Sequence, residues 1–368
     1  MREKYISAIN EIEKYYAFPD KHRELMKIIP LVKNGIFLIY GYYGYGKTVY
    51  ADLIGKVLFG VNSSQGKVNL SNELGIHDVF FWIDAGQLAK GKEVIEPRGI
   101  ISSPFKFINE LQRGNGRIYN TLLSLMSEKK IVYRDRVFST PDFVMLMDAN
   151  PMDSSSVKIP RALLDRVTAS FTMLTPNEDE REKLMYLEHS SPLDAVEPML
   201  TYEDMQKIWS EVERIKVPEG LVFLLTHLIH NYLNACEKGN KEYFTPEMMR
   251  SMCEGCRWRV EPCSELLEPL GQRWWIDAIK IAKARAYFEG REVNEEDVFF
   301  AVKYVLPHRV HLREDIKIAY VSPELWAEKL VERIKTELET RWIPALNGNE
   351  KALRDSERTL HFILEGRE

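Results

Sequence analysis

Short apolar runs alternate with helical patterns over the first half of the chain. The runs are Ile36–Tyr40, Val79–Ile83, Phe105–Ile108 and Phe143–Met147, and each is typical of a strand buried on both faces. Helical patterns lie before, between and after them, from residues 1–34 onward. Because strands alternate with helices, we predict a parallel sheet with crossover helices, an α/β fold.

The second half reads differently. Around Thr175–Lys183 the sequence becomes polar and charged, and the patterns beyond it are helical. We therefore expect an α/β domain over residues 1–175, an all-helical domain over 176–312 and a helical C-terminal extension over 313–368. The extension packs on its own or a neighbouring helical domain, or it docks a partner.

Composition narrows the class of protein. With 368 residues, 45% of them hydrophobic, the chain can bury a core in about two packed units, which excludes wholesale disorder. A net charge of −5 gives no overall basic excess for binding nucleic acid, and four cysteines are too few for a disulfide scaffold. We find no apolar signal core and no stretch long enough for a membrane span, so we expect a cytoplasmic protein.

The strongest motif follows the first apolar run. It fits G-x-x-x-x-G-K-[ST] at every position: Gly41, Tyr42, Tyr43, Gly44, Tyr45, Gly46, Lys47 and Thr48. The glycines let the backbone approach phosphate, and the following helix adds partial positive charge at its start. Lys47 is expected to reach the β- and γ-phosphates, and the Thr48 hydroxyl to ligate Mg²⁺. We predict a P-loop nucleotide site.

A P-loop enzyme also needs an acidic strand end. The third run leads into Asn109-Glu110, where Glu110 is placed to orient the attacking water. Asn109 stands where an aspartate is usual; an amide can bond a metal-bound water but lacks the charge. Slow hydrolysis is therefore one hypothesis, and Asn109→Asp is expected to raise turnover or Mg²⁺ affinity. Asp84 is a competing carboxylate, although an Asp after a strand is more typical of a cap or turn.

Several landmarks in this order resemble the MoxR group of AAA+ ATPases, within the helix-2-insert branch. Asn109–Arg113 resembles the group's D-E-I-N-R, Asn120–Met126 its N-A-L-L-E-A-M, and Ser127–Phe138 its hairpin before sensor 1. Further along, the resemblance is carried by Asp148–Pro151, Arg161–Val167, Gly271–Arg273, Ala282–Arg291 and Val293–Val298. It extends from about residue 20 to residue 312.

The resemblance implies a P-loop AAA+ sheet sandwiched by helices and followed by a helical lid. It implies sensor 1 at Asn150, an arginine finger at Arg166 with Arg161 as the weaker candidate, and sensor 2 at Arg273. Arg113 is expected near a subunit boundary. The implied activity is ATP hydrolysis with Mg²⁺ in a homohexameric ring.

Three functions follow as hypotheses. The first is a chaperone-like remodeller of protein clients, with a von Willebrand factor A-domain protein as the partner that the resemblance implies. The second is a nucleic-acid motor, favoured by the basic residues Lys129, Lys130, Arg134 and Arg136, which outnumber Glu128 and Asp135. A solvated hairpin explains these residues equally well. The third is a nucleotide-gated scaffold with slow hydrolysis, motivated by Asn109.

The cysteines offer a separate candidate site. Cys253 and Cys256 have zinc-ligand spacing and, with Cys263 and Cys236, could form a Cys₄ Zn²⁺ site. The second half of that pattern is not a pair, so buried small side chains or a disulfide are the alternatives.

Overall fold

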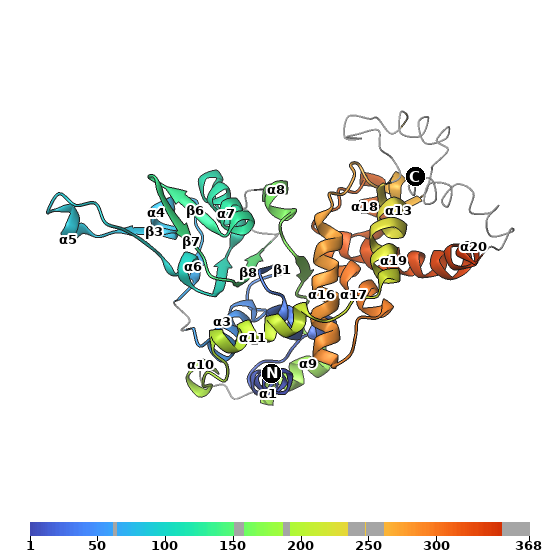
Figure 1. Ribbon diagram of the computed structural model, residues 1–368, viewed down its shortest axis with the longest axis horizontal. Coiled ribbons are helices and arrows are strands. Elements are labelled where there is room, and N and C mark those ends of the chain that lie inside the picture. Colours follow the sequence, from blue (N-terminus) through green and yellow to red (C-terminus); the bar gives the residue numbers. More distant parts are fainter. Residues whose placement is uncertain (62–64, 151–157, 187–191, 235–246, 248–260, 348–368) are drawn as a thin grey trace. The chain divides into compact units, whose positions relative to one another are not determined.

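The computed structural model describes residues 1–61, 65–150, 158–186, 192–234, 247 and 261–347, and it forms two compact units. The first comprises Met1–Ile215 with Lys283–Glu292, and the second Lys216–Ala282 with Val293–Glu368 (Figure 1). Within the described residues, no helix has the length and apolar character needed to cross a bilayer. Each unit is considered by itself.

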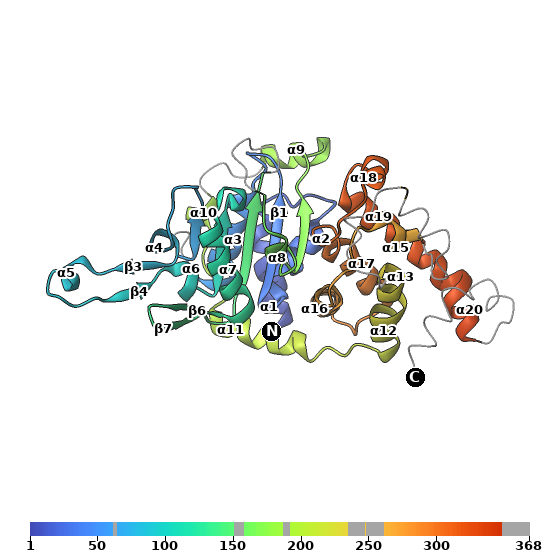
Figure 2. The same cartoon turned by 90° about the horizontal axis from the view of Figure 1, so that it is seen from above.

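A five-stranded sheet forms the centre of the first unit, and all its pairings are parallel. Its order is β2-β5-β8-β1-β9, formed by β2 (Lys67–Asn69), β5 (Phe105–Asn109), β8 (Val144–Ala149), β1 (Gly35–Tyr40) and β9 (Ala169–Thr172). The predicted α/β class with a parallel sheet is thus confirmed. The order matters for the site, because β8 lies between β1 and β5 (Figure 2).

Helices cover both faces of this sheet. On one face α7 packs against the alternate side chains Met145 and Met147 of β8, and on the other α3 approaches so closely that Gly55 lies against the Phe105 ring. The helices of this unit are α1 (Arg2–Glu13), α2 (Arg23–Ile28), α3 (Lys47–Phe59), α4 (Ile76–Val79), α5 (Ala85–Leu88), α6 (Gly99–Ser102), α7 (Gly116–Glu128), α8 (Arg161–Leu164), α9 (Glu178–Tyr186), α10 (Pro192–Ala195) and α11 (Tyr202–Glu213), with 3₁₀ turns η1 (Ile29–Leu31) and η2 (Leu111–Arg113).

One predicted strand of the main sheet was wrong. The run Val79–Ile83 ends helix α4 and continues as β3 (Phe81–Ile83), which pairs antiparallel with β4 (Ile95–Pro97) outside that sheet. A second hairpin, β6 (Lys130–Tyr133) with β7 (Arg136–Ser139), buries part of the run, since the Phe81 ring stacks on Tyr133 at 4.8 Å. Trp82 is 44% exposed. The apolar run therefore serves a hairpin contact rather than a fully buried strand.

The boundary between the units also differs from the sequence estimate near residue 175. Residues up to Ile215 belong with the sheet because α11 packs against the first unit's core. The indole of Trp209 is buried there, donates to the Pro30 carbonyl at 2.9 Å and lies against Phe59. A polar stretch in the sequence therefore precedes a helix that still belongs to the α/β unit.

The described residues of the second unit are helical or in loops, apart from one β-bridge between Leu266 and Leu312. Buried Glu265 links its helices by accepting from the Trp326 indole and pairing with Arg333, both at 2.6 Å. Its helices are α12 (Glu219–Phe223), α13 (His230–Asn234), α15 (Glu261–Glu265), α16 (Arg273–Glu289, which continues into the first unit), α17 (Glu295–Val305), α18 (Glu314–Tyr320), α19 (Pro323–Glu337) and α20 (Ile343–Leu346), with π-helical turns η3 (Leu224–Ile229) and η5 (Leu338–Trp342).

Candidate nucleotide-binding site

The predicted P-loop connects β1 directly to α3. Gly44 and Gly46 have φ values of 82° and 75°, in the left-handed region that a residue with a Cβ rarely adopts. Gly46 caps α3, a helix of 13 residues. The loop therefore turns back on itself and presents the start of α3, with its unpaired N–H groups, to the space beyond the sheet edge.

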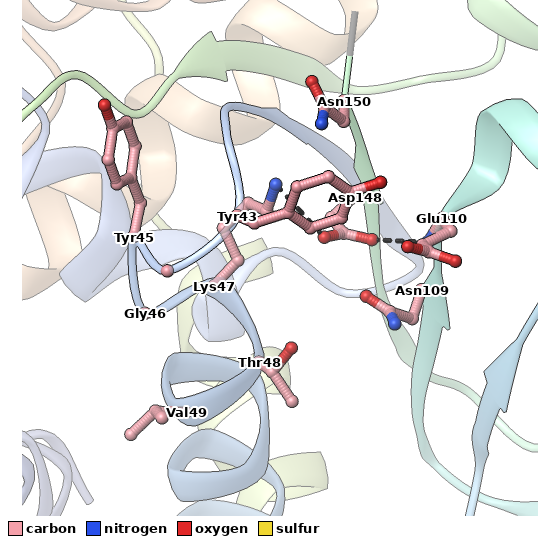
Figure 3. A pocket seen from close by; sticks show the side chains of 11 residues that line it. Tyr43, Tyr45, Gly46, Lys47, Thr48, Val49, Asn109, Glu110, Asp148 and Asn150 are labelled. Atoms are coloured by element: carbon pink, nitrogen blue, oxygen red, sulfur yellow. Dashed lines mark hydrogen bonds and ion pairs between the residues drawn. The ribbon is translucent and has the colours of Figure 1, made fainter. Parts of the chain in front are cut away.

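A cavity of about 330 Å³ lies at this edge (Figure 3). It is bounded by the P-loop on one side and by the carboxyl ends of β5 and β8 on the other. Its lining residues are Tyr43, Gly44, Tyr45, Gly46, Lys47, Thr48, Val49, Asn109, Glu110, Asp148 and Asn150. Open parallel sheets bind ligands at this edge.

Lys47 provides positive charge inside the cavity. Its side chain is buried, and its Nζ donates to the Gly41 carbonyl and, at 3.4 Å, to the Tyr42 carbonyl. The same Nζ lies 3.4 Å from Oδ2 of Asp148. Gly41 and Tyr42 thus hold the ammonium group through their carbonyl oxygens, beside the loop that would surround a phosphate.

The end of β5 changes direction sharply. Glu110 has φ 58° and ψ 50°, a left-handed conformation uncommon for a residue with a Cβ. Its N–H donates to Oδ1 of Asp148 at 2.6 Å, and its carboxylate pairs with Arg113 at 2.9 Å. Arg113 in turn donates to the Tyr43 hydroxyl at 3.1 Å, so this ion pair connects the end of β5 to the P-loop.

Asp148, which the sequence reasoning did not single out, lies at the centre of these contacts. The parallel register pairs Ile108 with Met147, so its continuation places Asn109 beside Asp148. With its amide nitrogen toward Asp148, Asn109 donates to Oδ1 at 2.9 Å and to Oδ2 at 3.2 Å. Burial raises the pKa of the Asp148 carboxyl, while the Glu110 N–H and Lys47 act against that rise.

A signal for this residue was present in the sequence. The fourth apolar run, Phe143–Met147, ends at an aspartate, and the carboxyl end of a parallel strand is a usual place for a functional side chain. Asn150, two residues after Asp148, was predicted as a site residue and lines the cavity. Its backbone N–H donates to the Gln112 side chain at 3.2 Å, which anchors the end of β8.

The donors around the cavity suit Mg²⁺. Thr48 offers a hydroxyl and Asp148 a carboxylate, and Mg²⁺ takes a few hard oxygen ligands together with substrate phosphates and water. In Figure 3 the Thr48 hydroxyl points to the side where Asn109 and Asp148 lie. Among the described residues no three His, Cys, Asp or Glu side chains form an all-protein metal cluster. The lining therefore fits a metal held jointly with a nucleotide.

The other predicted site residues are not in this lining. Arg166 follows α8, where it donates to the Ser127 hydroxyl and, at 2.6 Å, to the Ala162 carbonyl. Arg161 is exposed at the start of α8. Arg273 begins α16 in the second unit. Their roles stay predictions.

Asp84, the competing carboxylate, caps a short helix. Its side chain accepts from the N–H groups of Gly86 at 2.9 Å and Gln87 at 3.1 Å at the start of α5. It is not part of the cavity lining. The capping interpretation of Asp84 is confirmed.

The basic hairpin β6–β7 is largely neutralised by its own neighbourhood. Lys129 pairs with Asp142 at 2.8 Å and Lys130 with Glu128 at 3.5 Å. Arg134 pairs with the Glu93 carboxylate, and Arg136 donates to the Glu93 carbonyl at 3.3 Å. These partners favour a solvated hairpin over a strip of unpaired cations.

The Zn²⁺ hypothesis stays untested. Cys263 is buried on α15. Cys236, Cys253 and Cys256 lie outside the described residues.

Comparison with known proteins agrees with this architecture. Residues 272–322 match the AAA lid domain. An uncharacterized Bacillus subtilis (strain 168) protein, YeaC, is 23% identical over 252 residues, which cover 67% of this chain and 70% of YeaC. The crystal structure of a candidate ATPase from Cytophaga hutchinsonii superposes with a TM-score of 0.71 at 19% identity, over 91% of this chain and 94% of that one. The chain therefore has the fold of the AAA+ ATPases, with a P-loop sheet and an AAA lid domain.

Proposed function

We propose that this protein binds ATP with Mg²⁺ and hydrolyses it as a ring-forming AAA+ ATPase of the MoxR type. One observation carries the proposal. The P-loop, the buried ammonium group of Lys47 and the carboxylate-bearing residue Glu110 converge on a single cavity of about 330 Å³. Phosphoryl transfer needs mainly positioning and electrostatic stabilisation, and these groups supply both.

Each residue has a distinct task in this proposal. The N–H groups at the start of α3 and the ammonium group of Lys47 bind the phosphates. Glu110 accepts a proton from the attacking water and orients it, for which its carboxylate has to leave Arg113. Asn150 donates to the γ-phosphate or the water. When bound, Mg²⁺ neutralises charge on the β- and γ-phosphates, and Thr48 would hold it.

The proposed site is completed by arginines from outside the cavity. Arg166, half-buried just after α8, would reach the γ-phosphate bound by a neighbouring subunit, and Arg273 of the lid would contact the phosphates of its own subunit. A planar cation with several donors is suited to this task. This arrangement requires assembly, and a homohexameric ring is the form we propose.

Protein clients are favoured over nucleic acid by the character of hairpin β6–β7. Val132 and Val137 lie opposite each other in the hairpin register and are 63% and 60% exposed. Because Lys129, Lys130 and Arg134 pair with carboxylates and Arg136 donates to a carbonyl, the hairpin offers apolar surface as well as charge that is largely compensated. We propose chaperone-like remodelling of proteins in the cytoplasm, with a von Willebrand factor A-domain protein as the partner class suggested by the MoxR resemblance.

Two substitutions test nucleotide binding and turnover separately. Lys47→Ala removes the only cation that lines the cavity within the described residues, so ATP affinity measured by calorimetry should fall about 30-fold or more. Glu110→Gln should leave ATP affinity within a few-fold of wild type and lower kcat by about 10²–10⁴. Unchanged affinity in the first variant, or unchanged kcat in the second, would overturn the corresponding role.

The client class is tested with the wild-type protein. Turnover is measured alone, with a denatured protein and with single-stranded DNA. Stimulation by the denatured protein alone is the expected result. Stimulation by DNA alone would instead establish the nucleic-acid motor.

A further inference from the structure

The position of negative charge in the cavity leads to a further inference, which rests on the proposed ATPase function. P-loop sites place a carboxylate beside the metal at the end of the acidic strand. Here that strand, β5, ends in the neutral Asn109. Among the described residues that line the cavity, only Glu110 and Asp148 carry carboxylates. Glu110 is paired with Arg113 at 2.9 Å.

Asp148 occupies the same region from the adjacent strand. In a parallel sheet, residues at one register position point to the same face, and Asn109 and Asp148 share such a position. Their contact at 2.9 Å shows that the two side chains lie within one hydrogen bond of each other. A carboxylate on β8 can therefore act where a carboxylate on β5 would have acted.

The contacts of Asp148 also prepare it for a cation. Only 4% of the residue is exposed, so its charge is little screened by water. Its Oδ2 faces Lys47 at 3.4 Å, while Oδ1 accepts from the backbone N–H of Glu110 at 2.6 Å. Nucleotide phosphates would draw the Lys47 ammonium group away, and Oδ2 would then lack a cationic partner.

We propose that Asp148 supplies the metal-side carboxylate of this ATP site, in place of the aspartate that Asn109 replaces. The carboxylate then stands on β8 instead of the neighbouring strand β5, and it still faces the same cavity. Asn109 acts as a positioning residue, because its amide donates to Asp148 and orients it. This assignment removes the reason for expecting feeble hydrolysis from Asn109 alone.

Metal affinity tests the assignment independently of turnover. The probe is Mn²⁺, titrated into protein saturated with ADP and followed by electron paramagnetic resonance. Asp148→Asn keeps the size of the side chain and its acceptor for Glu110, but removes the charge. We expect Mn²⁺ to bind at least about tenfold more weakly to this variant. The matched control is Asp52→Asn, which removes a largely buried carboxylate of α3 that pairs with Lys67 at 3.0 Å and does not line the cavity.

A charge exchange makes the test decisive. The double variant Asn109→Asp with Asp148→Asn returns the carboxylate to β5, and its Mn²⁺ affinity should recover to within about threefold of wild type. If Asp148→Asn alone does not fold, the double variant decides: a folded double variant with near wild-type metal affinity supports the assignment, and one that is unfolded or binds Mn²⁺ weakly overturns it.

The remaining outcomes are also separable. Wild-type metal affinity in a folded Asp148→Asn variant sinks this inference and leaves the proposed ATPase intact. A loss in Asp148→Asn that the double variant does not restore assigns Asp148 a purely structural role, which also overturns it. Failure of the wild-type protein to bind ADP at all would overturn the proposed function itself.

Discussion

Strands β5 and β8 end at the same cavity but carry their charges in opposite places. β5 buries a lysine, Lys106, in its middle and ends in neutral Asn109 before Glu110. β8 is apolar from Val144 to Met147 and carries Asp148 next to its last residue, Ala149. The two strands are direct neighbours, and Lys106 is paired in register with Met145. β5 thus has a basic residue in its middle and no acid at its end, whereas β8 has an acid near its end and no basic residue.

The site depends on where the side chains lie in space and not on the motif of a single strand. Adjacent parallel strands in register bring their ends to the same edge of the sheet. A carboxylate on either end therefore reaches the same part of the cavity. The contact between Asn109 and Asp148 shows that side chains at these two strand ends are close enough to occupy the same part of the cavity.

The variant Arg166→Ala tests whether a single chain contains every group that turnover needs. Within the described residues no arginine lines the cavity, so the proposed arginine finger would come from outside it. Arg166→Ala should spare ATP affinity and lower turnover by about 10³-fold, as for other arginine fingers. Steady-state hydrolysis and calorimetric ATP binding measure the two parts.

A mixing experiment separates a shared site from a damaged fold. Arg166→Ala protein keeps its P-loop, and Lys47→Ala protein keeps its arginine. A mixed ring should therefore contain interfaces with one intact site and regain activity above either variant alone. Absence of recovery despite demonstrated co-assembly, or a strictly monomeric protein in the presence of ATP, would make Arg166 a structural residue that holds Ser127.

The sequence predicted the parts of this site that depend on local pattern. A glycine motif between an apolar run and a helix can be recognised from the local sequence, without knowledge of tertiary contacts. The P-loop, the strands β1, β5 and β8, and the position of Glu110 were therefore all predicted. The run Val79–Ile83 had the same apolar character but became part of a hairpin, because its burial comes from the Tyr133 ring, which is distant in sequence. Asp148 was missed because its place beside Asn109 depends on which strand pairs with β5, and the local sequence does not give that pairing.

With Asn109→Asp, the ends of both strands carry a carboxylate. Asn109→Asp replaces the donor to Asp148 with a like charge at about the same separation, so the metal-free protein should lose about 1–3 kcal/mol of unfolding free energy at neutral pH. Mg²⁺ with ADP should narrow this difference, because a cation attracts both carboxylates. The sequence-based expectation of higher Mg²⁺ affinity for this variant is therefore retained, with a stability loss added. Urea unfolding with and without Mg²⁺ and ADP measures both effects.

The matched control for that variant is Asn294→Asp. Asn294 caps α17 by accepting from the Asp297 N–H at 3.2 Å, and an aspartate caps a helix equally well. Its stability should therefore change little. Equal stability of Asn109→Asp and wild type in the absence of metal would contradict the close pairing of Asn109 with Asp148.

β5 also holds a buried lysine whose charge depends on pH. Lys106 donates to the carbonyls of Ile101 at 2.9 Å and Ser103 at 2.6 Å, and its Nζ lies 5.2 Å from the centre of the Phe143 ring. Burial lowers the pKa of its ammonium group from 10.5 to about 7. No acidic partner is among these contacts, so desolvation is not offset by an ion pair.

Stability should therefore rise with pH over the range in which only the folded protein has lost this proton. Between about pH 7 and pH 10 the unfolded chain keeps the Lys106 proton and the folded chain does not, so this group adds up to about 1.4 kcal/mol of unfolding free energy per pH unit. Lys106→Met should remove that slope, measured by urea unfolding at pH 7, 8 and 9. Lys130→Met, at a half-exposed hairpin position, should retain it. Parallel stability curves for Lys106→Met and wild type would show that Lys106 stays protonated in the folded protein, and that β5 holds a true buried charge beside the apolar strand β8.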